Sequence, residues 1–155
     1  MKNILKFIIA IATTEIAGGV SGFLTFDSIK NWYSTLNKPF FNPPDFIFGP
    51  VWVILYLLMG ISLFIIWKEA PGTSRTRAFL VFGIQLFLNF WWSIFFFTFK
   101  RPDLAMVEIV CLWLVIVWMI WVFRQLKPVA GYLQIPYLLW VTFASVLNAA
   151  IYLLN

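Results

Sequence analysis

WYSTLNKPFFNPPDFIFGPVWVILYLLMG, residues 32–60, begins as a polar loop and ends as an apolar helix. Four prolines interrupt its first part: Pro39, Pro43, Pro44 and Pro50. Because proline inside a regular helix removes a hydrogen bond, these residues predict an extended loop as far as the helix start. The helix that follows carries on one face Trp52, Tyr56, Met59 and Gly60. A loop this rich in phenylalanine beside an apolar helix is predicted to fold back as a lid over the other helices.

The composition is that of a membrane protein. Of the 155 residues, 63% are apolar, 21% aromatic and only 11% charged, far from the composition of soluble domains. The net charge of +5 comes from basic residues in short segments between apolar runs. This pattern indicates membrane topology and no nucleic-acid partner.

The residue inventory also limits the chemistry. The chain has no histidine and a single cysteine, Cys111, so it can form neither an internal disulfide nor a histidine-ligated haem or zinc site. We therefore expect no metal site and no required cofactor. Any chemistry must come from aromatic side chains, amides and a few carboxylates.

Five apolar runs have about the length of roughly 20 residues that a membrane-spanning helix needs. They cover about residues 4–26, 46–67, 78–99, 104–123 and 130–153. The first could alternatively be a signal peptide, since Lys2 and Lys6 precede an apolar run with a cleavage-like Ala10-Ile11-Ala12, but its apolar character continues to Phe26. The fold class expected is a single all-α membrane domain over residues 1–155, with five spanning helices and the proline-rich lid between the first two.

Five spans place the two termini on opposite sides of the membrane. The N-terminal side would collect Lys2, Lys6, Lys68, Arg75, Arg77, Arg124 and Lys127. The other side would carry Lys30, Lys38, Lys100 and Arg101. Since basic residues favour the cytoplasmic side, the N terminus is predicted to be cytoplasmic and the lid to lie outside.

Four of the spans place their less hydrophobic residues on one face at helical spacing. These faces are Glu15, Gly18, Gly19 and Gly22; Gln85, Asn89, Trp92, Ser93 and Phe96; Glu108 and Cys111; and Tyr137, Trp140, Ala144 and Asn148. Facing inward, they would build a bundle interior of aromatic rings and amides. The amides would either join helices or bind a ligand.

Two glutamates lie within the apolar runs. A carboxyl group at membrane depth is a functional candidate, as a proton carrier or a partner for a cation. Glu15, near the middle of the first run, either points into a cavity or is protonated and bonded to a neighbouring helix. For Glu108, near the start of the fourth run, a structural bond to donors in the lid or a loop is the favoured interpretation.

Small residues offer places where helices can approach closely. Gly18 and Gly22 form a small-xxx-small pair, which would pack inside the bundle or against a second copy of the chain. A homodimer is expected through surfaces away from the pocket. The candidate residues are Gly18 and Gly22 on the first helix, with Ala78 and Gly83 on the third.

Three long blocks carry a family resemblance. They are WYSTLNKPFFNPPDFIFGPVWVILYLLMG at residues 32–60, QLFLNFWWSIFF at 85–96 and PYLLWVTFASVLN at 136–148. On these blocks the chain resembles the TspO/MBR family, which includes tryptophan-rich sensory proteins and the translocator protein, also called the peripheral-type benzodiazepine receptor. The resemblance implies a five-helix bundle with a pocket closed by the first loop. Its expected ligands are porphyrins of the protoporphyrin IX type and related hydrophobic aromatic molecules, bound within membrane lipid.

By motif position, the resemblance makes Trp52 and Trp140 the candidate residues for light-dependent porphyrin breakdown. The full set of expected ligand-binding residues is Trp52, Tyr56, Asn89, Trp92, Tyr137, Trp140, Ala144 and Leu147. The expected lid residues are Trp32, Lys38, Pro39, Pro43 and Pro44. The cholesterol-recognition pattern of animal members is incomplete, because Tyr152 is followed only by Leu153, Leu154 and Asn155, so cholesterol binding is not carried over.

Two other functions are alternatives to a protein that only binds its ligand. Glu15 could serve a proton-coupled exporter of small molecules, and the same pocket could serve a sensor that regulates partner proteins. Ordinary enzyme chemistry is not expected, because no paired carboxylates, serine–histidine arrangement or metal cluster is present in the pattern.

Overall fold

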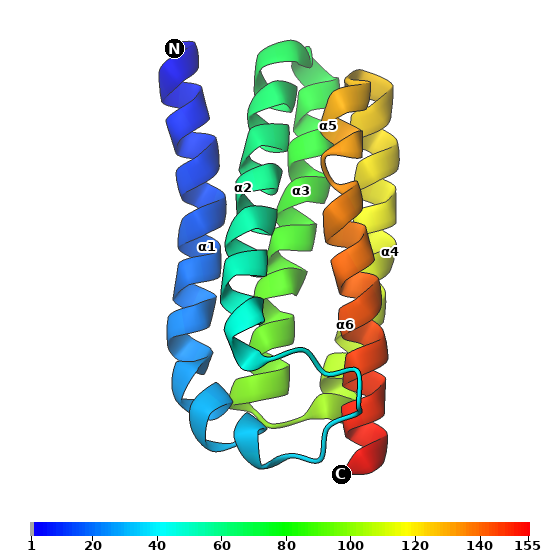
Figure 1. The fold of residues 1–155 in the computed structure, drawn as a ribbon. Helices are drawn as coiled ribbons and strands as arrows, with labels where there is room; N and C mark the ends of the chain where they lie inside the picture. Colours follow the sequence, from blue (N-terminus) through cyan, green and yellow to red (C-terminus); the bar gives the residue numbers. More distant parts are fainter. Residues whose placement is uncertain (1) are drawn as a thin grey trace.

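Five long helical segments run side by side along one axis (Figure 1). The computed structural model describes residues 2–155. Its long helices are α1 (Asn3–Asn31), α2 (Asp45–Glu69), α3 (Gly72–Ser93), α4 (Pro102–Leu126) and α6 (Ile135–Leu154), with a short α5 (Pro128–Tyr132) before the last. Each of the five segments is long and apolar enough to cross a membrane, which confirms the predicted all-α fold with five spanning helices.

Two helix ends differ from the sequence prediction for identifiable reasons. α2 already begins at Asp45, so Pro50 lies inside the helix and not in the extended loop. At the sixth helical position this proline removes only the bond to the carbonyl of Phe46, close to the exposed helix start. Asp45 in the first turn favours the helix start because its charge complements the helix dipole.

The fifth predicted span, 130–153, is broken in two. α5 ends at Tyr132 and α6 begins at Ile135. Pro136 explains the break, because a proline ring clashes with the carbonyl four residues earlier, here that of Tyr132. In the other segments the helices extend one to six residues beyond the expected bounds, except that the third segment ends at Thr98, one residue short of the expected end, with α3 continuing as a π-helical turn over Ile94–Thr98.

Packing separates a buried interior from an apolar exterior. Met59, Ile66 and Phe123 are completely buried, whereas Phe23, Val107 and Leu139 are exposed on the outside of the bundle. An apolar exterior around helices whose backbone groups bond internally is what a lipid environment requires. The chain is therefore an integral, multi-pass membrane protein.

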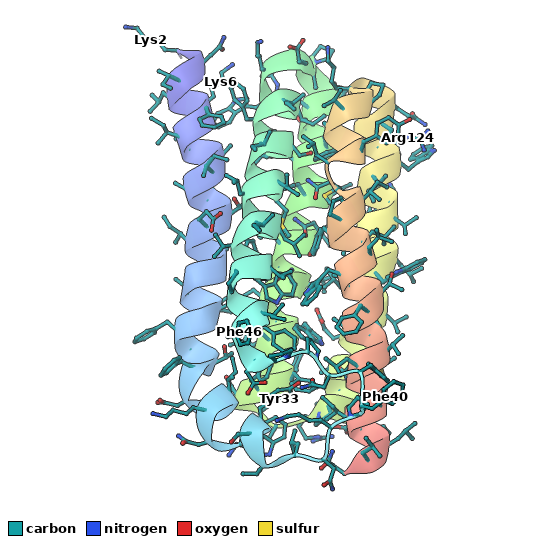
Figure 2. The ribbon with its side chains drawn as sticks, viewed as in Figure 1. Lys2, Lys6, Tyr33, Phe40, Phe46 and Arg124 are labelled. Atoms are coloured by element: carbon teal, nitrogen blue, oxygen red, sulfur yellow. The ribbon has the colours of Figure 1, made fainter. Side chains whose placement is uncertain are left out.

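The connection between α1 and α2 crosses the end of the bundle at which the C terminus lies (Figure 1). It reaches α6 before returning to the start of α2, and its Asn37 bonds there to Asn155. The labelled residues Lys2, Lys6 and Arg124 lie at the opposite end, while Tyr33 and Phe40 lie at the end with the loop (Figure 2).

Candidate ligand-binding pocket

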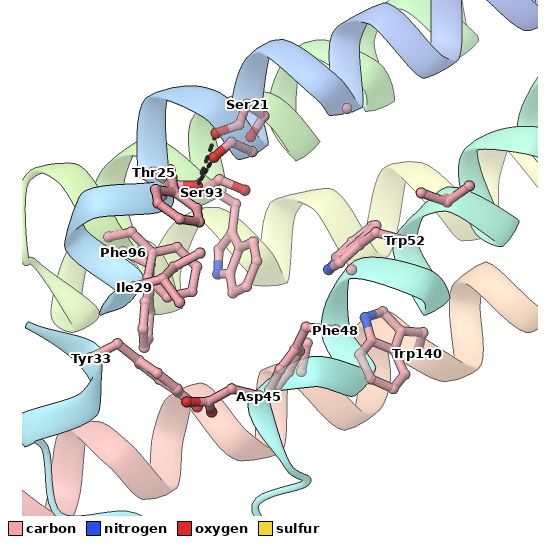
Figure 3. A pocket seen from close by; sticks show the side chains of 18 of the residues that line it. Ser21, Thr25, Ile29, Tyr33, Asp45, Phe48, Trp52, Ser93, Phe96 and Trp140 are labelled. Atoms are coloured by element: carbon pink, nitrogen blue, oxygen red, sulfur yellow. Dashed lines mark hydrogen bonds between the residues drawn. The ribbon is translucent and has the colours of Figure 1, made fainter. Parts of the chain in front are cut away.

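A cavity of about 540 Å³ opens among α1, α2, the end of α3 and α6 (Figure 3). Its walls are mostly apolar and aromatic, with contributions from each of these helices. A volume of this size is typical of sites for small organic ligands. The cavity lies in the half of the bundle that the α1–α2 loop covers.

Trp52 stands at the centre of an aromatic wall. Its ring centroid lies 5.6 Å from that of Tyr56, 6.5 Å from Trp92 and 6.5 Å from Trp140. The Trp52 and Trp140 rings are nearly perpendicular, at 88°. Such a cluster offers flat faces to a planar ligand and edges that fix the rings in place.

Trp52 reaches this position because α2 carries aromatic residues at every fourth position. Phe48, Trp52 and Tyr56 share one helix face and all line the cavity. Phe48 in turn packs edge-on against Trp140 of α6, with ring centroids 5.9 Å apart. The spacing therefore builds one continuous wall from the helix start inward.

The α1 wall is made of small residues. Gly18 lies directly against the ring of Tyr56, so that a Cβ atom there would overlap the ring. Gly19 and Gly22 also line the cavity, and a Cβ on either would meet nothing within 4 Å. The lack of side chains at these positions leaves the space that the cavity occupies.

A buried chain of hydrogen bonds holds Tyr56 from behind. The Tyr56 hydroxyl donates to Asn89 Oδ1 at 2.6 Å, Asn89 Nδ2 donates to the Tyr137 hydroxyl at 2.8 Å, and that hydroxyl donates to Gln85 Oε1 at 2.8 Å. All four side chains are buried, so each bond satisfies a group that water cannot reach. The network fixes the tilt of the Tyr56 ring.

A second set of bonds holds the wall at α3 and α6. Trp92 Nε1 donates to Asn148 Oδ1 at 3.1 Å, and Asn148 Nδ2 donates to the carbonyl of Pro102 at 2.9 Å. Asn148 thus positions the Trp92 ring and ties the start of α4 to α6.

Six of the eight ligand residues expected from the sequence line the cavity: Trp52, Tyr56, Trp92, Trp140, Ala144 and Leu147. Asn89 and Tyr137 do not line it; they belong to the buried network behind Tyr56. A residue that lines the cavity and a residue behind its wall show the same inward-facing pattern in the sequence. The sequence alone therefore did not separate Asn89 and Tyr137 from the wall residues.

The five expected lid residues, Trp32, Lys38, Pro39, Pro43 and Pro44, are absent from the cavity wall. The start of the loop contributes Tyr33 to the wall instead, and the start of α2 contributes Asp45 and Phe46. The Tyr33 hydroxyl donates to Asn42 Oδ1 at 2.7 Å, and Lys38 Nζ lies 4.6 Å from the centre of the Tyr33 ring. Lys38 therefore braces a wall residue without touching the cavity.

Phe48 and Tyr33 are wall residues that the sequence analysis did not select. The i, i+4 spacing of Phe48 to Trp52 would have identified the first. For Tyr33, which follows the end of α1, no periodic signal exists.

The two glutamates have different surroundings. Glu15 lines the inner end of the cavity, in line with one of its two predicted positions. Among residues 2–155, both carboxylate oxygens of Glu108 are buried without a hydrogen-bond partner, so the expected bond to lid or loop donors is wrong. Glu108 lies six residues after Pro102, the first residue of α4, and therefore inside the helix.

The small residues expected at a dimer interface fall into two groups, those packed within the chain and those exposed. Gly18 and the completely buried Ala78 contact other parts of the same chain and are not available to a second copy. Gly22 and Gly83 are exposed.

Comparison with known proteins agrees with this architecture. The TspO/MBR family profile matches residues 9–154. The chain is 43% identical to the tryptophan-rich protein TspO of Archaeoglobus fulgidus over 155 residues, covering 99% of both chains. It is 38% identical to the tryptophan-rich sensory protein of Cereibacter sphaeroides over 76% of this chain and 72% of that one. It is 36% identical to the translocator protein of sheep, Ovis aries, over 82% of this chain and 79% of the relative. With a family match across nearly the whole chain and relatives at this level of identity, the chain belongs to the TspO/MBR family.

Proposed function

We propose that this protein is a membrane receptor or translocator that binds porphyrins of the protoporphyrin IX type, and related flat aromatic molecules, in the cavity around Trp52. The observation that carries the proposal is the wall of three tryptophans, Trp52, Trp92 and Trp140, around a space of about 540 Å³. Membership of a family of translocator and tryptophan-rich sensory proteins supports the general class of function.

Binding in such a cavity relies on stacking and shape. Because the chain has no histidine, metal-free protoporphyrin IX should bind at least as well as haem. The test is quenching of tryptophan fluorescence by both ligands in detergent or nanodiscs, for the wild type and Trp52→Leu, with the exposed Trp121→Leu as the matched control. Only Trp52→Leu should weaken binding. A clear preference for haem with an iron-ligated absorption spectrum contradicts the proposal.

A second function follows from the pair of indole rings in one cavity. Trp52 and Trp140 pack edge to face in one wall of the cavity, with ring centroids 6.5 Å apart, so a light-excited porphyrin bound against this wall would face two oxidisable side chains. The proposed activity is therefore light-dependent oxidative breakdown of the porphyrin, in which an indole radical or a photogenerated oxygen species attacks the ring and dissolved molecular oxygen is the oxidant. Loss of porphyrin absorbance under illumination should slow in Trp52→Phe, Trp140→Phe and the double variant, with dark samples as controls. Equal decay in the wild type and the double variant, with binding retained, would show that the rings are only walls.

The α1–α2 loop is proposed as the lid of this cavity, with the membrane providing the ligand's surroundings. The protein is also proposed to form a homodimer; of the two exposed small residues, Gly22 and Gly83, only Gly83 lies away from the cavity. Cross-linking of the wild type and Gly83→Phe in nanodiscs tests the dimer.

Net flux of a porphyrin across reconstituted vesicles separates a carrier from a sensor that only binds.

A further inference from the structure

The cavity carries acidic side chains and no basic one. Among the residues that form its wall, Glu15 and Asp45 are the titratable carboxyl groups, and neither lysine nor arginine contributes. Lys38, in the loop, places its Nζ over the ring of Tyr33 and does not line the cavity. A ligand in the cavity therefore meets only negative charge.

The two carboxyl groups lie at opposite ends of the cavity. Asp45 is the first residue of α2, and Glu15 lies on α1 next to Gly18, which contacts Tyr56. Since Asp45 and Tyr56 are eleven residues apart on one helix, the ends are separated by about 16 Å. Asp45 thus lies at the end of the cavity near the loop, which we call the mouth, and Glu15 lies at the inner end, within the membrane span.

Glu15 has no partner of its own to offset its charge. Within residues 2–155 its side chain forms no ion pair, and the hydrogen bonds of its neighbours go elsewhere: Thr14 donates to the Tyr56 carbonyl and the Tyr56 hydroxyl to Asn89. A carboxyl group at membrane depth is costly unless a counter-charge meets it. The open space that Gly19 leaves one turn along α1 from Glu15 is where such a group would fit.

The aromatic rings of the cavity suit a cation as well. Trp52 and Tyr56, whose ring centroids lie 5.6 Å apart, line the same cavity as Glu15. Indole and phenol faces attract an ammonium or amidinium group through their negative faces. A carboxyl group and two aromatic faces together provide the elements of a site for an organic cation.

We propose that Glu15 is a cation subsite at the inner end of the cavity, so that the protein favours flat aromatic ligands bearing an amine or amidine over ligands bearing a carboxylate. The inference rests on the proposed function, because it assigns a charge preference to the same cavity. A ligand with anionic side groups would have to direct them past Asp45 and out of the mouth into water, because both ends of the cavity carry a carboxyl group.

Three probes that share one macrocycle and differ in charge test the inference. They are protoporphyrin IX with its two carboxylates, its neutral dimethyl ester, and a bis-amide of it that carries two terminal amines. In nanodiscs of neutral lipid, we expect the amine derivative to bind at least about tenfold more tightly than the acid, as a charge-assisted contact predicts. Glu15→Gln should reduce this ratio toward one and leave the affinity of the ester unchanged. Asp27→Asn on the same helix is the matched control, since Asp27 is exposed and does not line the cavity.

The possible outcomes are distinct. If all three probes bind with equal affinity, or if the ratio persists in Glu15→Gln, the subsite is wrong while the proposed binding function stands. If only Asp45→Asn abolishes the ratio, the preference originates at the mouth and its assignment to Glu15 is overturned. If none of the probes binds folded wild-type protein, both the subsite and the proposed function fail. Equal elution volumes and helical content show that each variant is folded.

Discussion

At the scale of single residues, Gly18 and Gly22 have the same spacing signature but different surroundings. A Cβ on Gly18 would overlap the Tyr56 ring, whereas a Cβ on Gly22 would meet nothing within 4 Å. Tyr56 cannot retreat easily, because it is buried and bonded to Asn89. Gly18 thus supports the packing of α1 on α2, and Gly22 only leaves space.

We expect Gly18→Ala to destabilise the protein by about 1–3 kcal/mol, the usual cost of overpacking. Gly22→Ala should leave stability within about 1 kcal/mol of the wild type, since alanine is the better helix former. Thermal unfolding in detergent, followed by circular dichroism, measures both. Equal losses in the two variants would mean that α1 and α2 do not meet through Gly18.

Glu108 and Gln134 pose a different problem, because their buried polar atoms have no hydrogen-bond partner among residues 2–155. An unpartnered buried polar group costs about 1–3 kcal/mol. We therefore expect Glu108→Leu and Gln134→Leu to leave the melting temperature unchanged or to raise it. Asn148→Leu is the control: its amide bonds Trp92 and Pro102, so the same kind of substitution should lower the melting temperature. A marked fall for Glu108→Leu would show that this carboxyl group has a partner after all.

At the scale of the elements, the loop between α1 and α2 is fastened to the end of α6. The backbone N–H of Asn37 donates to Asn155 Oδ1 at 3.0 Å, and Asn155 Nδ2 donates to the Asn37 carbonyl at 2.9 Å. The Asn155 amide thus bonds both the N–H and the carbonyl of the Asn37 backbone, which would otherwise be hydrogen-bonded to water. The loop is held across the bundle end at this point.

Asn155→Ala should free the loop without altering the cavity wall, because Asn155 does not line the cavity. Losing two hydrogen bonds of about 1 kcal/mol each should raise hydrogen exchange at the Asn37 amide by at least about fivefold. Association of protoporphyrin IX should become faster if the loop is the lid. Asn31→Ala, at an exposed position at the end of α1, is the control. Unchanged exchange in Asn155→Ala would rule out the fastening.

The sequence was sufficient to predict the five spans, since apolar runs of the right length leave few other folds for such a composition. It did not predict that α2 would tolerate Pro50, because a single lost hydrogen bond near a helix start is cheap, or that Pro136 would split the last segment. Both outcomes depend on where a helix begins, which periodicity does not fix.

For the cavity, helical spacing and motif position brought out Trp52, Trp92 and Trp140, which do line it. Spacing could not separate a wall residue such as Tyr56 from Asn89 one layer behind it, because both face inward and only their depth differs. Tyr33 depends on how the loop folds back, a long-range contact with no local signal.

At the scale of the whole molecule, the distribution of basic residues along the bundle axis predicts its orientation. Lys2, Lys6 and Arg124 lie at the end opposite the loop, as Figure 2 shows. The connection between α2 and α3, residues 70–71, and that between α4 and α5, residue 127, lie at the same end. By the expected topology this end carries seven of the eleven lysines and arginines. Basic residues are retained on the cytoplasmic side, and we therefore propose a cytoplasmic N terminus with the mouth of the cavity on the other side.

Two single-cysteine variants test this orientation, each in a Cys111→Ser background so that no other thiol is present. Thr73→Cys puts the thiol at an exposed position at the start of α3, and Phe40→Cys puts it in the exposed loop at the other end. In intact spheroplasts, a membrane-impermeant maleimide should label the Phe40→Cys variant, while the Thr73→Cys variant should react only after the cells are permeabilised. Neither substitution removes a basic residue, so the charge difference that sets the topology is preserved. The reverse labelling pattern would place the cavity mouth in the cytoplasm, and ligands would then reach Trp52 from inside the cell.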